Sequence, residues 1–252
     1  AAPDALREAV RRCLDSAGEP PAGAGAIIAP HAGYVYSGPV AASAYARLRG
    51  AGGRLQRAAV LGPAHFHRFE GLAVSAAEAF ATPLGDVPLD RAGVEAVLAL
   101  PRVQVLEAAF EEEHCIEVQL PFLQETLGDF SLVPLLVGEA TPADAAAAIE
   151  ALWDGRTLIV VSSDLSHHHP AGRAREIDGA TARAIESNRP GEVGPGGACG
   201  HIAVRGLMEA AQRRGFKAQT VDLRHSGDTA GSHERVVGYG AFVFFDEEGK
   251  PA

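Results

Sequence analysis

Four short apolar runs, each bounded by turn-forming residues, constrain most strongly what this chain can fold into. They are 26–30 (AIIAP), 57–63 (RAAVLGP), 131–138 (SLVPLLVG) and 157–164 (TLIVVSSD). Runs of this length without polar alternation are typical of strands buried on both faces, as in a parallel sheet covered by helices. The run at 157–164 is the strongest parallel-strand candidate in the chain.

Segments with helical periodicity separate these runs. We expect helices over 4–17, 90–99, 112–127, 142–153, 173–187 and 199–214, and one that Ser37 caps and that ends before Gly50. Further strands are expected over 71–77, 103–110, 216–225 and 237–245. Strand and helix alternate with short connections, and no linker divides the chain. The sequence therefore predicts one α/β domain over 1–252, with a largely buried, mixed central sheet and helices on both faces.

Charge and composition exclude some classes of protein. The net charge of −10 argues against a nucleic-acid binder, because phosphate contacts need a basic surface. No run approaches the roughly 20 apolar residues that span a bilayer, and the charged start is unlike a signal peptide. The three cysteines at 13, 115 and 199 are too few for a disulfide framework. A cytoplasmic protein with reduced thiols is expected.

Histidine or cysteine follows several of the predicted strands. His31 follows the first run and His65 the second, His167 lies just beyond the fourth, and Cys199 follows a glycine-rich turn. Because strand ends of an α/β sheet meet at one edge, these four residues are expected to converge. Two imidazoles and a thiolate suit Fe(II), zinc or copper and leave coordination positions open. A closed zinc site would take His167 as a fourth ligand.

Each of these residues also has a purely structural interpretation. Cys199 is predicted at a helix N-terminus, where the helix dipole would lower its thiol pKa, but a small buried residue would fit there too. Ser162, Ser163 and Asp164 offer hydrogen bonds that would orient His167. The adjacent pair 168–169 is expected in a solvated loop.

A grouping E-H-x-x-E is formed by Glu113, His114 and Glu117. On the predicted helix 112–127, His114 and Glu117 would share a face. The grouping is not the H-E-x-x-H pattern of zinc proteases, and by itself it indicates a polar helix face. Pro121 predicts a kink or break in that helix.

Several of these segments together resemble the Memo family, the mediator-of-cell-motility-like proteins. The matching segments, in order between residues 26 and 204, are AIIAPHAGYVYSG, VLGPAHF, EEHCIEVQLPFLQ, LVPLLVG, VVSSDLSH and CGHIAV. The resemblance implies a fold similar to that of the class III extradiol dioxygenases, which are non-haem iron enzymes that open catechol rings.

The resemblance also implies a set of site residues. It places the metal site on His31, His65 and Cys199, and His167 at the position of the acid–base histidine of the dioxygenases. Asp164 and His114 fall near the same cleft. The dioxygenases hold iron through two histidines and a carboxylate, so the thiolate here changes the iron's charge distribution, and ring cleavage does not follow from the fold.

Three functions remain open at this point. The first is a mononuclear Fe(II)-dependent redox enzyme or dioxygenase acting on a small molecule, aromatic or carbonyl-bearing, with copper or zinc as alternative metals. The second is a metal-free thiol enzyme with Cys199 as nucleophile and His167 as base. The third is a non-catalytic adaptor that binds a metal or a peptide.

Two further expectations concern the substrate and the partners. Tyr34, Tyr36 and Phe66 are expected to line a substrate pocket. The resemblance implies a pathway link to a radical SAM protein and an AMMECR1-like protein, because prokaryotic relatives often occur beside them.

Overall fold

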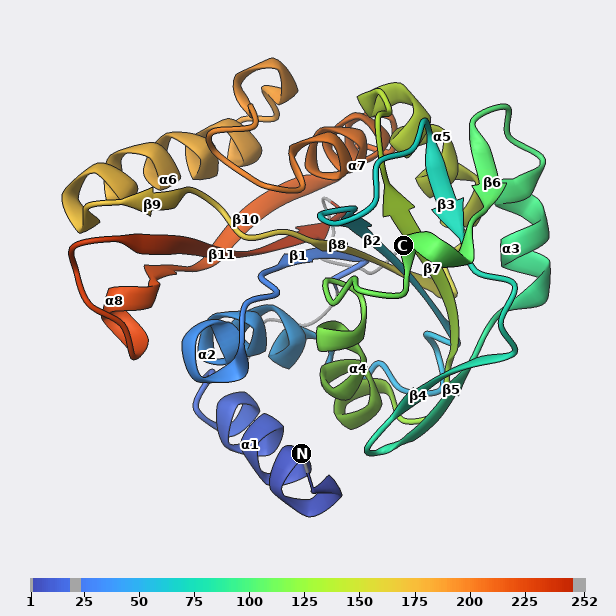
Figure 1. Ribbon diagram of the computed structural model, residues 1–252, viewed down its shortest axis with the longest axis horizontal. Coiled ribbons are helices and arrows are strands. Elements are labelled where there is room, and N and C mark those ends of the chain that lie inside the picture. Colours follow the sequence, from blue (N-terminus) through green and yellow to red (C-terminus); the bar gives the residue numbers. More distant parts are fainter. Residues whose placement is uncertain (1, 19–23, 247–252) are drawn as a thin grey trace.

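A computed structural model describes residues 2–18 and 24–246 of the chain (Figure 1). Its centre is a nine-stranded sheet in the order β10-β11-β1-β8-β2-β7-β3-β6, with β9 paired to β11. The strands are β1 (Ala26–Ala29), β2 (Arg57–Pro63), β3 (Leu72–Val74), β6 (Val103–Val105), β7 (Ser131–Val137), β8 (Thr157–Ser162), β9 (His167–His169), β10 (Lys217–His225) and β11 (Val236–Phe245). A separate hairpin pairs β4 (Ala79–Thr82) with β5 (Gly85–Pro88).

The four apolar runs form the middle of the sheet. Strands β1, β8, β2 and β7 are neighbours and run parallel. On one side β11 pairs antiparallel with β1 and then with β10, and on the other β3 pairs antiparallel with β7. The sheet is therefore mixed, as predicted, and the parallel strands present their carboxyl ends at a common edge.

Helices cover both faces of the sheet (Figure 1). They are α1 (Pro3–Asp15), α2 (Tyr34–Tyr45), α3 (Arg91–Leu98), α4 (Leu120–Leu127), α5 (Pro142–Leu152), α6 (Ala171–Glu186), α7 (His201–Arg213) and the short α8 (Ser226–Thr229). Single turns of 3₁₀ helix lie at Ala46–Leu48, Glu107–Ala109, Glu117–Gln119 and Pro190–Glu192. Neighbouring strand residues point to opposite faces: Ile27 packs into a core with α1, α2 and α4, and Ile28 into one with α3, α5, α6 and α7. This arrangement confirms the predicted α/β fold.

The predicted helix over 112–127 is wrong in its first half. Only a 3₁₀ turn at Glu117–Gln119 and α4 are helical, and Pro121 lies in the first turn of α4, where its missing N–H costs nothing. His114 and Glu117 do not share a helix face. The cause is Glu113, whose buried carboxylate accepts the backbone N–H groups of His114 and Cys115 and holds this segment in an irregular turn.

Two predicted helix starts also differ. The helix after β1 begins at Tyr34, and Ser37 lies inside it with its hydroxyl donated to the Ala32 carbonyl, so Ser37 is not the N-cap. The helix predicted from Cys199 begins at His201, so the cysteine lies in the turn before it. The helix from Pro142 is as predicted, with a capping box between Thr141 and Asp144.

Strand β9 and the β4–β5 hairpin were not predicted. The hairpin segments carry no clear period-two pattern, and β9 contains three consecutive histidines that indicate a solvated loop. None of the helices in the described part of the chain combines the length and the apolar character of a membrane span.

Candidate metal centre

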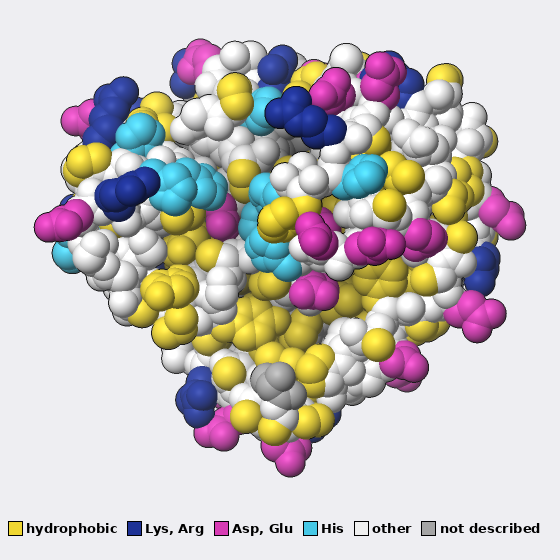
Figure 2. Space-filling model, in the orientation of Figure 1, with side chains coloured by type: hydrophobic (Ala, Val, Ile, Leu, Met, Phe, Trp, Pro, Cys, Tyr) yellow, Lys and Arg dark blue, Asp and Glu magenta, His cyan; other side chains and the backbone are white. Residues whose placement is uncertain are grey.

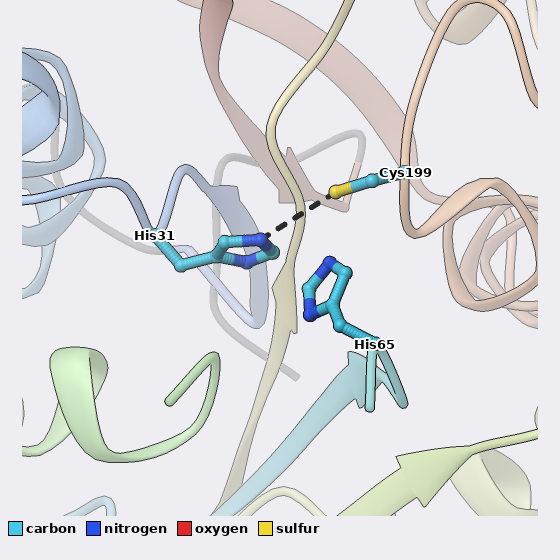
Figure 3. Close-up of side chains that lie close together, drawn as sticks. All are labelled: His31, His65 and Cys199. Atoms are coloured by element: carbon cyan, nitrogen blue, oxygen red, sulfur yellow. Dashed lines mark hydrogen bonds between the residues drawn. The ribbon is translucent and has the colours of Figure 1, made fainter. Parts of the chain in front are cut away.

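Three residues predicted as metal ligands meet at the carboxyl edge of the parallel strands (Figure 3). His31 lies just after β1, His65 just after β2, and Cys199 in the turn before α7. One ligand atom from each lies within 4.8 Å of the others. The Cys199 Sγ is 3.5 Å from the His31 Nε2, and the centroids of the two imidazoles are 5.3 Å apart.

The ring orientation of His31 is fixed by a buried hydrogen-bond network. Its Nδ1 lies 2.9 Å from the Ser162 hydroxyl, whose single proton is donated to the Cys115 carbonyl at 2.6 Å. The Ser162 oxygen must therefore accept from Nδ1, so His31 carries its proton there. Its Nε2 lone pair is left facing the thiol, which is the form of imidazole that binds a metal.

The network continues to the core through Gln119. The Tyr45 hydroxyl donates to the Gln119 Oε1 at 2.8 Å, so the amide nitrogen points the other way and donates to the Ser162 hydroxyl oxygen and the Pro30 carbonyl. Both Gln119 and Tyr45 are completely buried. The orientation of His31 is thus determined by groups that lie well inside the protein.

Glu113 has the same effect on His65. Its carboxylate oxygens lie 3.0 and 3.1 Å from the His65 Nδ1, and Oε2 also accepts the backbone N–H of His65 at 2.7 Å. The Nδ1 proton is donated to the carboxylate, and Nε2 faces Cys199. Burial raises the pKa of Glu113, but the hydrogen bonds from His65 and Cys115 outweigh burial and lower that pKa to about 2. Hydrogen bonds to Cys199 and Glu113 raise the pKa of His65 to about 10.

Cys199 is held by hydrogen bonds rather than by a helix. Its backbone N–H donates to the Asp164 carbonyl at 3.1 Å, and Sγ lies 3.7 Å from the Ser163 hydroxyl. Burial raises the pKa of the thiol. The hydrogen bonds with the imidazoles of His31 and His65 together outweigh burial and lower that pKa to about 7. The lowered pKa that the sequence predicted from a helix dipole therefore comes from the two imidazoles.

Asp164 positions the loop that carries His31. It is buried, and its Oδ1 accepts the backbone N–H of His31 at 2.8 Å. Burial raises the pKa of Asp164, while that hydrogen bond and the nearby His167 act in the opposite direction. The carboxylate contacts the backbone at the site rather than the imidazole of His167.

The other two candidate catalytic residues lie differently. His114 is beside the ligands, with its ring centroid 5.7 Å from that of His65 and 5.8 Å from that of His31. His167 lies on β9, donates from Nδ1 to the Leu165 carbonyl at 2.9 Å and is exposed. In the part of the chain that the structure describes, its side-chain contacts are with Leu165 and His168 rather than with the three ligands.

The aromatic residues that were predicted to line one pocket lie in different parts of the structure. Phe66 is exposed and packs against the rings of His65 and His114, which places it at the site. Tyr34 points into the fold, where its hydroxyl donates to the Val118 carbonyl and its ring packs on Phe122. Figure 2 shows histidine side chains gathered near the middle of this face, next to an apolar hollow.

Sequence reasoning did not assign Glu113, Gln119 or the full role of Ser162. Both Glu113 and Gln119 lie in the segment EEHCIEVQ, but the helical assignment put Glu113 on a polar helix face and gave no role to Gln119. The pairing of Glu113 with His65 depends on two segments 48 residues apart meeting in space. Cys115 packs in the core under Gly62, and α1 packs Cys13 against the same core, as expected for structural thiols.

The donor set and its spacing fit a metal ion. Zinc bonds of about 2.0 Å to nitrogen and 2.3 Å to sulfur place tetrahedral ligand atoms about 3.4–3.6 Å apart. The separation of 3.5 Å between the Cys199 Sγ and the His31 Nε2 has this size. Iron and copper accept the same donors, so the arrangement does not distinguish among these metals.

Comparisons with known proteins agree with the resemblance seen in the sequence. The family described as "Memo-like protein" matches residues 1–243. A MEMO1 family protein of Methanococcoides burtonii is 35% identical over 95% of this chain and 93% of its own length, and one of Aquifex aeolicus is 34% identical over 87% and 85%. The crystal structure of an uncharacterized Escherichia coli K12 protein covers 86% of this chain and 98% of its own, with a TM-score of 0.52 at 14% identity, which shows a shared fold. The chain therefore belongs to the Memo family.

Proposed function

We propose that this protein is a mononuclear metal-dependent redox enzyme that binds Fe(II) through His31, His65 and Cys199 and acts on a small, aromatic molecule. The observation that carries the proposal is the orientation of the ligands. Two imidazoles from separate strands, each with Nδ1 donated to a buried acceptor, present Nε2 to one thiol. Structural histidines have no need of such matched orientation.

Three protein ligands favour a reactive site over a closed structural one. Structural zinc sites hold the metal with four protein ligands, whereas catalytic sites leave a position open. In the part of the chain that the structure describes, the group consists of His31, His65 and Cys199. When bound, Fe(II) supplies redox chemistry toward O₂. The residues of the chain hold the ion, transfer protons and contact the substrate.

The surrounding residues have distinct roles in this proposal. Glu113 and Ser162 fix the ligand tautomers, and Asp164 fixes the backbone at His31. His167 is the proton-transfer group, since donation from Nδ1 to Leu165 leaves its Nε2 free. His114 and Phe66 stand beside the ligands, where they contact the substrate.

The metal-free thiol enzyme is less well supported. That mechanism needs a general base beside the nucleophile, and it was assigned to His167. His167 contacts Leu165 and His168 rather than the Cys199 sulfur, so the mechanism as stated lacks its base, and the Nε2 of His31 would have to take that role. The adaptor function and the link to a radical SAM protein and an AMMECR1-like protein stay predictions.

Elemental analysis of protein purified anaerobically without a His-tag tests the proposal. We expect Cys199→Ser to contain about one iron per chain less than wild type. The control is Cys13→Ser, which removes a thiol on α1 and should keep the wild-type iron content. Wild type that takes up neither iron nor copper would overturn the proposal.

A second experiment asks whether the bound metal supports turnover. O₂ consumption is measured with reductant and a panel of catechols and other phenols. We expect consumption that needs iron, is lost in Cys199→Ser and is strongly reduced in His167→Asn. Iron binding without any consumption that depends on Cys199 would favour the adaptor.

A further inference from the structure

A second cluster of ligand-type side chains lies at the outer end of the β10–β11 pair, beside α8 (Figure 1). His225 is the last residue of β10, Asp228 lies in α8, and His233 lies in the loop before β11. One ligand atom from each lies within 4.8 Å of the others. The cluster shares no residue with the site at His31, His65 and Cys199.

His225 is the unusual member of this cluster. It is 1% exposed, its side chain faces the backbone N–H of Asp228 at the start of α8, and neither ring nitrogen has an aligned hydrogen-bond partner. A buried polar group without a partner costs about 1–3 kcal/mol, so such groups are rare unless they serve a purpose. The His225 Nδ1 lies 3.2 Å from the Asp228 Oδ2, but out of line for a hydrogen bond.

The contact between the His225 Nδ1 and the Asp228 Oδ2 has the geometry expected of two atoms that bind the same metal ion. An ion bound by both atoms sits to one side of the line that joins them, and tetrahedral nitrogen and oxygen ligands lie about 3.3–3.5 Å apart. Asp228 is held for this role by two other contacts. Its Oδ1 accepts from Arg175 at 2.9 Å, and Oδ2 accepts the backbone N–H of His225 at 3.1 Å.

The third ligand, His233, approaches through a space that a glycine provides. A Cβ added to Gly227 would lie 2.8 Å from the His233 Nδ1 and 3.0 Å from the Ser232 carbonyl oxygen. A side chain at position 227 would therefore collide with the His233 imidazole where it now lies. His233 itself is exposed, with its ring 5.6 Å from that of His225, so solvent can reach the cluster.

The local charge also favours a cation. Gly238 is the register partner of His225 on β11, and the carboxylate of Asp178 on α6 occupies the place of its missing Cβ. Residues directly opposite on paired strands share a face, so Asp178 lies on the same face as His225. Two carboxyl groups, those of Asp178 and Asp228, therefore lie around His225, and Arg175 pairs with Asp228 alone.

We propose that His225, Asp228 and His233 form a second metal site, which binds a borderline divalent cation of the zinc type. Two imidazoles and one carboxylate are a donor set for such ions, and the open side toward solvent takes water. A bound ion would join the end of β10 to α8 and to the loop before β11. This site does not depend on the redox function proposed above.

Equilibrium dialysis against Zn²⁺ tests the site. Free Zn²⁺ is buffered below the range in which isolated surface histidines bind. We expect His233→Ala to bind one Zn²⁺ per chain less than its parent, both in wild type and in Cys199→Ser. The control is His67→Ala, which removes an exposed imidazole outside both clusters and should bind as much as wild type.

A second variant keeps all three ligands and changes only their spacing. Gly227→Ala should weaken Zn²⁺ binding at this site about tenfold or more, the size of effect seen when metal ligands lose their orientation. Unchanged Zn²⁺ stoichiometry in His233→Ala would overturn the proposal, whatever happens at Cys199. Loss of zinc in Cys199→Ser alone would place the only zinc site at the first centre and would also overturn it.

Discussion

The two imidazoles of the metal centre are oriented by hydrogen-bond partners outside the group of three ligands. Glu113 accepts the Nδ1 proton of His65, and Ser162 accepts that of His31, so each imidazole presents Nε2 to the thiol of Cys199. Acceptors of this kind raise the basicity of a ligand and remove alternative ring orientations. The affinity of the site therefore depends on residues that would not touch the metal.

Replacing Glu113 tests this dependence. Glu113→Gln keeps the size of the side chain but loses the charge and one acceptor, so His65 is no longer fixed. We expect metal affinity to fall about 10–100-fold, measured by competition with a chromophoric chelator. The control is Glu112→Gln on the exposed neighbour, which should bind like wild type. If both variants bind the metal with equal affinity, Glu113 does not contribute to metal binding.

The three thiols should react very differently in metal-free protein. Imidazole contacts lower the pKa of Cys199 to about 7, whereas burial raises the pKa of both Cys13 and Cys115. Only the thiolate is nucleophilic, so iodoacetamide labelling of Cys199 should increase as pH rises through about 7 and decrease below it. Peptide mapping by mass spectrometry identifies the labelled thiol. Preferential labelling of Cys13 at neutral pH would contradict this order.

At the scale of elements, the parallel strands and the loops beyond them are packed closely enough to specify small residues. Gly62 near the end of β2 leaves room for Cys115, and an added Cβ would collide with the Cys115 sulfur. This contact holds the irregular turn that carries Glu113 against the strand that leads to His65. Packing between a strand and a turn thus positions two groups of the site.

A double-mutant cycle measures that contact. Gly62→Ala should lower the free energy of unfolding by about 1–3 kcal/mol, because the added methyl overpacks the turn. Cys115→Ala in the same chain removes the sulfur and should recover most of the loss. Denaturant unfolding of the four proteins gives the coupling. If the two changes in the free energy of unfolding simply add, the side chain at 62 and the Cys115 sulfur are not in steric conflict.

At the scale of the molecule, the site exists only when the whole sheet is formed. Its ligands come from positions 31, 65 and 199, and an unfolded chain cannot hold them together. A metal that binds only the folded state stabilises it by about 2.7 kcal/mol at a free concentration of 100 times Kd. Folding stability and metal supply are therefore linked in this protein.

Thermal unfolding should show this linkage. Anaerobic addition of Fe(II) to metal-free protein should raise the Tm, and Cys199→Ser should abolish most of the increase. Cys13→Ser, which keeps the three ligands, should respond like wild type. A Tm that is indifferent to Fe(II) in wild type would mean that the folded chain has no preference for the ion.

The sequence by itself determined the fold class and the four residues expected to converge, and the family resemblance selected His31, His65 and Cys199 among them as metal ligands. Short apolar runs bounded by turn residues predict buried strands, and residues that follow such strands, as His31 and His65 do, meet at the carboxyl edge. His31, His65 and Cys199 needed no knowledge of their partners to be selected. The helix from Pro142 was equally predictable, because the Thr141–Asp144 capping box that starts it is local in sequence.

Only the tertiary structure decided how those ligands are oriented. The segment 113–116 is irregular because Glu113 reaches His65, and His31 is fixed by Ser162, Gln119 and the distant Tyr45. The second cluster at His225 likewise needs two strands and a short helix to come together. The periodicity of a segment depends on which of its residues pack against the core. A hydrogen bond between two segments far apart in the sequence does not change the periodicity of either segment, so it cannot be predicted from it.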